Sequence, residues 1–282
     1  MTAGVRSFAE RLSAAVAEAG APLCVGLDPD PSQLPSHLEG GIDGVRQFCL
    51  EVNAATGHWA AAFKPNIAFY ERFGAEGWLA LIDVISAARE HGLVIVDAKR
   101  GDIGHTAAAY AETLFATLGA DACTANPYLG HDAVTPLLSM PGRVAFVLCR
   151  TSNPGAADFQ DLAVGPEGRP LYLEVARRVV EWDRLGPGDT AGLVVGATWP
   201  AELHAVRTVA PTLPILIPGV GAQGGDLAAA AAAAAGPDGR APFLLSISRG
   251  IASASRGRDF AEAAAAAASR YHQQLSAVPL PF

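Results

Sequence analysis

Charged residues are scarce in this chain of 282 residues, and acids outnumber bases among them. Only 17% of residues are charged, and 28 Asp and Glu against 20 Lys and Arg give a formal net charge of -8. Because broad contact with nucleic acid or an anionic bilayer needs an excess of basic groups, we expect neither as a partner. A small anionic ligand needs only local cations. Hydrophobic residues make up 50% of the chain, which is ample for a large core and excludes intrinsic disorder.

Long apolar runs, metal-ligand clusters and closely spaced cysteines are also missing. No stretch approaches the roughly 20 residues of a membrane span, and Arg6, Glu10 and Arg11 lie where a signal peptide would be apolar, so we expect a cytoplasmic protein. The seven histidines form no HExxH motif or Cys/His cluster. We therefore expect no metal and no other cofactor. The four cysteines lie far apart and are expected to be reduced and structural: Cys24, Cys49, Cys123 and Cys149.

Lysine is by far the rarer of the two basic residues. Only Lys64 and Lys99 are lysine, and the other 18 of the 20 basic residues are arginine. A lysine ammonium is compact and can lose its proton, whereas a guanidinium effectively cannot. The two lysines are therefore candidates for chemistry that arginine cannot supply. The alternative is that they remain by chance at solvated positions.

Eight apolar runs of strand length recur along the chain, separated by stretches with helical periodicity. Most runs are continuous, which is typical of strands covered on both faces. Eight such units in a chain of this length predict an α/β fold, a (β/α)8 barrel formed by residues 1–282 as a single domain. The segment 158–170 is expected to be a loop. The eight runs are Leu23–Asp28, Ala61–Asn66, Leu93–Lys99, Ala122–Pro127, Val144–Arg150, Gly192–Thr198, Leu213–Gly219 and Phe243–Arg249.

Polar residues lie at the ends of these runs, on the side of a barrel that holds active sites. In the third run Asp97 and Lys99 are two residues apart, so on a regular strand both side chains point to the same face. Asp102 follows in the loop. Since burying charges at a barrel mouth is costly, we interpret them as functional; the alternative is a buried ion pair with a loop aspartate. The full set of polar residues at the ends is Asp28, Lys64, Asn66, Asp97, Lys99, Asn126, Arg150, Ser152 and Arg249.

Two segments rich in glycine or serine follow the seventh and eighth runs. They are PGVGAQGGD at 218–226 and SISRGI at 246–251. Barrels commonly bind phosphate with these two loops, because glycines allow backbone N–H groups to approach the oxygens. Arg249 adds a cation that can bind phosphate through two nitrogens. One such segment is more often an ordinary turn, but its occurrence after both strands favours a phosphate site.

The chain resembles the orotidine 5'-phosphate decarboxylase family, in its longer bacterial subgroup. The most specific segment is DAKRGDIGHT at 97–106, which is similar to the family signature D-x-K-x-x-D-I-x-x-T. FKPN at 63–66, TSNPG at 151–155, PGVGAQGG at 218–225 and SRG at 248–250 match further family segments in the same order. The spacers are longer than in compact members, notably from Thr151 to Thr190.

The resemblance implies decarboxylation of orotidine 5'-phosphate to UMP and CO2 in pyrimidine biosynthesis. It implies a catalytic array of Lys64, Asp97, Lys99 and Asp102, in which Asp102 reaches the active site of the partner subunit of a homodimer.

Further roles implied by the resemblance concern substrate binding. Asp28 and Thr106 are expected to contact ribose or phosphate-side groups, Ser152 the pyrimidine ring, and Gln223 with Arg249 the phosphate. The complete expected binding set is Asp28, Asn66, Ile103, Thr106, Ser152, Pro218, Gln223, Ser248, Arg249 and Gly250.

The reaction itself explains why lysine and aspartate are needed. Loss of CO2 from C6 leaves a carbanion in the ring plane with no carbonyl to delocalise it, so we expect electrostatic catalysis without a metal. Asp97 beside the departing carboxylate disfavours the ground state, and Lys99 stabilises the developing anion and then protonates C6. Two alternatives remain open. One is a sugar-phosphate decarboxylase, aldolase or epimerase that uses a metal or a Schiff base, and the other is a sugar-phosphate or nucleotide sensor without catalysis.

Overall fold

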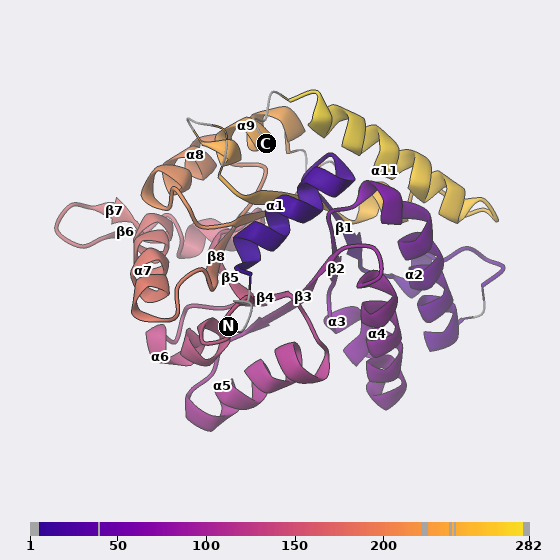
Figure 1. Ribbon diagram of the computed structural model, residues 1–282, viewed down its shortest axis with the longest axis horizontal. Coiled ribbons are helices and arrows are strands. Elements are labelled where there is room, and N and C mark those ends of the chain that lie inside the picture. Colours follow the sequence, from indigo (N-terminus) through magenta and orange to yellow (C-terminus); the bar gives the residue numbers. More distant parts are fainter. Residues whose placement is uncertain (1–5, 39, 221–224, 237–238, 240, 279–282) are drawn as a thin grey trace, which may run out of the picture.

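The structure, a computed structural model, describes residues 6–38, 40–220, 225–236, 239 and 241–278. Eight parallel strands close into a barrel with helices between them, which confirms the predicted fold class (Figure 1). Each of the eight apolar runs overlaps one barrel strand. Neighbouring strands follow the order β1-β10-β9-β8-β5-β4-β3-β2. Their bounds are β1 Leu23–Leu27, β2 Ala62–Pro65, β3 Leu93–Arg100, β4 Ala122–Ala125, β5 Val144–Arg150, β8 Ala191–Val195, β9 Ile215–Pro218 and β10 Phe243–Ile247.

Helices cover the outside of the barrel, and one lies across an end of it (Figure 1). Helix α1 (Phe8–Ala19) begins with a capping box, in which Ser7 and Glu10 satisfy each other's backbone N–H groups. The other long helices are α2 Ile42–Thr56, α4 Gly74–Ala88, α5 Gly104–Ala111, α7 Leu171–Leu185, α8 Pro200–Val209, α9 Leu227–Ala235 and α11 Phe260–Ser276. Three short ones are α3 Ala68–Glu71, α6 His131–Val134 and α10 Arg249–Ala252.

The barrel interior has an apolar layer beneath a polar one. Phe8, Leu12 and Val16 of α1 pack with alternate strand residues in one buried cluster that includes Ala62, Ile95, Ala122 and Leu244. Two residues further along the same four strands come Lys64, Asp97, Thr124 and Ser246, all of them buried. Since side chains alternate along a strand, each polar residue follows its apolar neighbour on the same face. The core thus supports a polar layer at the carboxyl ends of the strands.

We expected the segment 158–170 to be a loop, and this expectation was only partly correct. It contains two short antiparallel strands, β6 (Ala163–Val164) and β7 (Arg169–Pro170), which pair as a hairpin. Gly165 and Gly168 between them have φ of +69° and +61°, a conformation that glycine adopts without strain. The hairpin projects away from the barrel beside α7 (Figure 1).

All four cysteines are buried and carry free thiols, as the sequence indicated. Burial raises the pKa of Cys24, Cys49 and Cys149 to about 12, so none of these three is a ready nucleophile at neutral pH. Among the described residues, none of the helices combines the length and the apolar character that crossing a bilayer requires. That residues 1–282 form a single domain stays a prediction.

Candidate active site

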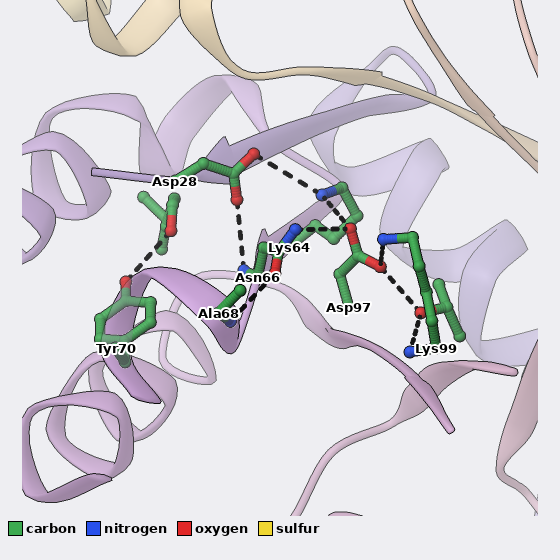
Figure 2. Close-up of polar contacts among 9 residues, drawn as sticks. Asp28, Lys64, Asn66, Ala68, Tyr70, Asp97 and Lys99 are labelled. Carbon is green, nitrogen blue, oxygen red and sulfur yellow. Dashed lines mark hydrogen bonds and ion pairs between the residues drawn. The ribbon is translucent and has the colours of Figure 1, made fainter. Parts of the chain in front are cut away.

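Asp97 lies at the centre of a charged network at the carboxyl end of the barrel (Figure 2). Its Oδ2 is 3.2 Å from Nζ of Lys64, and its Oδ1 is 2.6 Å from Nζ of Lys99. Burial by itself would raise the pKa of Asp97, but the two ammonium groups, with hydrogen bonds from Lys99 and Thr124, hold that pKa well below its usual range. Asp97 is therefore a carboxylate at neutral pH.

Lys64 is the buried cation of the network. Its side chain is 7% exposed, and its Nζ lies 3.2 Å from Asp97 and 3.8 Å from Oδ2 of Asp28. Burial opposes the charged form, yet the carboxylates of Asp28 and Asp97 raise the pKa of Lys64 above its ordinary value. Asn66 links the same two carboxylates, because its N–H donates to Asp28 at 3.2 Å and its side-chain amide to Asp97 at 3.4 Å.

Lys99 is the open end of the network, with 48% of its side chain exposed. Its φ is +49°, and among the described residues only Asp189 shares a positive φ without being glycine. The pairing of β3 with β4 also shifts register between Val96 and Arg100. Such backbone irregularities occur at functional sites, where they re-aim side chains. Lys99 and Asp97 thus meet through a bulged strand rather than through the regular alternation we expected.

A cavity of about 690 Å³ opens beside this network. Lys64, Asp97 and Asp28 line it, and so do Ser248 and Arg249 from the segment after β10. Its size is typical of a site for a small organic ligand. The whole lining is Asp28, Pro29, Asp30, Gln33, Leu34, Phe48, Lys64, Phe69, Asp97, Pro218, Gly219, Val220, Ser246, Ser248, Arg249, Ala252 and Ser253.

Residues predicted from the loop after β3 do not line this cavity. Asp102 accepts a hydrogen bond from the N–H of Ile103 at 2.8 Å, and no contact with Lys64 or Lys99 is recorded for it within the described chain. Ile103 and Thr106 are exposed. Asp102 does not cap α5, because Ile103 holds the N-cap position and makes no side-chain capping bond. The catalytic role of Asp102 therefore stays a prediction, and it depends on a second subunit.

The other predicted binding residues fall into three groups. Pro218, Ser248 and Arg249 line the cavity, as described. Ser152 is half-buried in the segment after β5, and Gly250 lies in α10 so close to α11 that a Cβ there would be 2.6 Å from Oη of Tyr271. Neither of these two lines the cavity. Gln223 lies outside the described residues.

Thr124 is a site residue that the sequence reasoning missed. Its Oγ1 donates to Asp97 at 2.8 Å and accepts the N–H of Lys99 at 2.9 Å, so it holds both residues in place. The signal was available, because Thr124 follows the interior residue Ala122 by two positions in the fourth run. Among the described side chains, no three from His, Cys, Asp and Glu come together as metal ligands, and independence of a metal stays a prediction.

Comparisons with known proteins agree on one family. The profile of the orotidine 5'-phosphate decarboxylase / HUMPS family matches residues 21–266. An orotidine 5'-phosphate decarboxylase of Roseiflexus castenholzii is 47% identical over 273 residues, which are 96% of this chain and 98% of that one. The solved structure of Leishmania donovani OMP decarboxylase is 40% identical, with a TM-score of 0.80, 95% of this chain covered and 100% of that one. Leishmania donovani UMP synthase gives 42% and a TM-score of 0.84; the match covers 96% of this chain but only 56% of that longer protein.

Proposed function

The chain belongs to the orotidine 5'-phosphate decarboxylase / HUMPS family, and we propose that Asp97 and Lys99 carry out its chemistry. Its reaction is the decarboxylation of orotidine 5'-phosphate to UMP and CO2 in pyrimidine biosynthesis, the activity for which relatives of nearly equal length are named. The finer assignments concern how this site performs the reaction.

One observation carries the proposed mechanism. A single cavity is lined by the pair of Lys64 and Asp97 and, after β10, by Arg249. A nucleoside monophosphate has a reacting ring at one end and a dianionic phosphate at the other. The cavity therefore supports a pose with the phosphate at Arg249 and C6 of the ring beside Asp97, whose Oδ1 lies 2.6 Å from Nζ of Lys99.

The reaction is an electrostatic exchange of charge at C6. The carboxylate of Asp97 lies beside the substrate carboxylate, and this repulsion is relieved when the C6–carboxylate bond breaks and CO2 leaves. The electron pair stays on C6, where the ammonium of Lys99 stabilises it and then donates a proton. Because Lys64 is charged and hydrogen-bonded to Asp97, it keeps that carboxylate ionised.

The phosphate end supplies binding energy at a distance from the reacting atoms. Arg249 is exposed, so its guanidinium is accessible and can form two parallel bonds to phosphate oxygens. Such remote binding energy serves to organise the reacting centre. The proposed partner of Arg249 at the phosphate is Gln223.

The proposed active unit is a homodimer with shared sites. Beside Asp102 in the chain, Ile103 is 60% exposed, and Tyr128 and Leu129 after β4 are 83% and 54% exposed. In the proposed dimer a second copy packs on these apolar side chains, and its Asp102 enters the site of the first. If so, mixing inactive Asp102→Ala with inactive Lys99→Ala should restore about a quarter of the sites, since random exchange makes about half of the dimers mixed, each with one intact site. No recovery after verified subunit exchange would confine Asp102 to its own subunit.

The activity and its metal independence are tested together. Loss of orotidine 5'-phosphate is followed by absorbance with the purified chain, with and without a chelator, and after treatment with borohydride. We expect full turnover in all three conditions. Inhibition by the chelator would favour a metal-assisted reaction, and inactivation by borohydride in the presence of substrate would favour a Schiff base.

A further inference from the structure

Arg150 is a buried cation at the carboxyl end of β5 that the proposed mechanism does not use. Its side chain is 2% exposed, and the pairing of β5 with β8 shifts register between Leu148 and Arg150. An irregularity of this kind re-aims a side chain at a barrel rim. The same feature accompanies Lys99 on β3.

The guanidinium of Arg150 gathers both ends of the segment that follows it, residues 151–161. One nitrogen lies 3.1 Å from Oδ2 of Asp161, and another lies 3.3 Å from Oε1 of Gln160 and 3.4 Å from the carbonyl of Thr151. Gln160 and Thr151 also bond each other twice, with both distances 2.8 Å. The two ends of segment 151–161 are therefore joined at the Arg150 guanidinium, which makes the segment a closed loop.

The face of the same guanidinium fixes this closed loop to the segment that follows β8. The Arg150 Cζ lies 4.3 Å from the ring centroid of Trp199, which follows β8, and Trp199 Nε1 donates to the carbonyl of Thr151 at 3.1 Å. Stacking on an aromatic face together with bidentate bonding is available to arginine but not to lysine. Ser152 belongs to this closed loop and packs against Gly196. A Cβ atom added to Gly196 would lie 2.9 Å from the Cβ of Ser152.

A second buried arginine shows that this arrangement is not simply how the fold hides a cation. Arg207 is also 2% exposed, and its Nε, Nη1 and Nη2 all donate to backbone carbonyls, including those of Ala234, Leu213 and Pro242. Within the described residues, Arg150 Nε is buried without an acceptor. Unlike Arg207, Arg150 directs two of its nitrogens to side chains of the segment that follows it, those of Gln160 and Asp161.

We propose that Arg150 is a positioning residue, which holds segment 151–161 against Trp199 and so places Ser152 at the pyrimidine end of the site. This inference rests on the proposed function and on the role that the family resemblance implies for Ser152, which is contact with the pyrimidine ring; Ser152 itself does not line the cavity. Arg150 touches no reacting atom. It acts by fixing the segment that carries Ser152, the residue expected to contact the pyrimidine ring.

The test separates the ring end of the ligand from the phosphate end. Dissociation constants for UMP and for uridine are measured with Arg150→Met and Asp161→Asn, together with kcat/KM for orotidine 5'-phosphate. For Arg150→Met we expect equal loss of affinity for both ligands and a fall in kcat/KM on the order of 10²-fold, since misplacing a contact residue has this effect. For Asp161→Asn we expect about a tenfold fall, because one charge-assisted bond is lost. Arg249→Ala should weaken UMP alone.

Hydrogen exchange without ligand gives a second readout. In Arg150→Met we expect faster exchange of amides in 151–161 and unchanged exchange in the strands on the far side of the barrel. Arg207→Met is the matched control, because it removes an equally buried guanidinium away from the cavity. It should lower the melting temperature and leave both affinities unchanged.

The inference is overturned if a folded Arg150→Met retains both affinities, or if it weakens UMP but not uridine. If Arg150→Met does not fold, Asp161→Asn decides by the same criteria, because its carboxylate is 44% exposed. The unchanged chain is assayed first. Absence of turnover there would contradict the proposed function, whereas an active chain with unaffected variants contradicts only the role of Arg150.

Discussion

At the carboxyl end of the barrel Asp97 lies between Lys64 and Lys99, and at the amino end Asp121 lies between Arg11 and Arg143. Both aspartates are buried, with side chains 10% and 6% exposed. The two clusters therefore share a design, in which one carboxylate is neutralised by two cations. They differ in the cation that the sequence uses.

At the amino end the charges fasten chain segments together. Asp121 accepts the N–H of Val94 at 2.9 Å in addition to both guanidinium groups, and Arg11 reaches from α1 to the carbonyl of Gly142 at 3.1 Å. Arginine suits this task, since its fork of donors can join several acceptors at once. At the carboxyl end Lys64 lines a cavity and Lys99 is 48% exposed, and in the proposed mechanism Lys99 gives up a proton. The comparison indicates why a chain with 18 arginines keeps two lysines.

The largest expected effect comes from removing Lys99, the exposed cation at the carboxyl end. Lys99→Ala should lower kcat by about 10³-fold or more, because both the electrostatic stabilisation of the carbanion and the proton donor are lost. Affinity for UMP should be largely retained, since the proposed phosphate contacts, Arg249 and Gln223, lie elsewhere in the chain. Turnover by absorbance and UMP titration check the two statements. Activity above about a tenth of that of the unchanged chain would remove Lys99 from the mechanism.

The corresponding change at the amino end should alter stability and not chemistry. Asp121→Asn leaves two guanidinium groups without their carboxylate, and we expect the free energy of unfolding to fall by about 2 kcal/mol. The kcat should be unchanged at temperatures where the variant is folded. Denaturant unfolding and the absorbance assay measure both quantities on the same preparation. A large loss of kcat in the folded variant would erase the distinction between the two ends.

A smaller effect should appear in the pH dependence of stability. Since the pKa of Asp97 is held below its ordinary value of 3.8, its ionised form adds stability above that pH, and this contribution is lost as pH falls towards the lower native pKa. The unfolding free energy of the unchanged chain, minus that of Asp97→Asn, should fall by about 1 kcal/mol in the first pH unit below the ordinary value. Denaturant titrations over the acid range measure this difference. A constant difference would mean that the pKa of Asp97 is not depressed.

The sequence was sufficient for the fold and for most of the carboxyl-end network. Continuous apolar runs predict strands buried on both faces, and their polar last residues place Lys64 and Asp97 at one rim. The conformation of Lys99 was not predictable, because a positive φ in a lysine depends on the register shift against β4 and on the bond to Thr124. Local patterns contain no information about such pairings.

The amino-end cluster was missed for a related reason. Arg11 and Asp121 are 110 positions apart, and nothing near either residue in the sequence indicates the other. Only the closure of the barrel beneath α1 brings them together. The closed loop at Arg150 was missed in the same way, because Trp199 contacts it from the segment after a different strand, β8. Long-range contacts of this kind require the fold before they can be identified.

The most direct test of the central claim exchanges the two kinds of cation between the ends. Lys99→Arg and Arg143→Lys are prepared, and kcat for orotidine 5'-phosphate and affinity for UMP are measured for both. Lys99→Arg keeps the charge but cannot release a proton, so we expect a loss of about 10³-fold in kcat with UMP still bound. Arg143→Lys should keep kcat and lose only about 1 kcal/mol of stability. A Lys99→Arg variant that retained more than about a tenth of the activity would contradict the claim that this end needs an ammonium able to give up its proton.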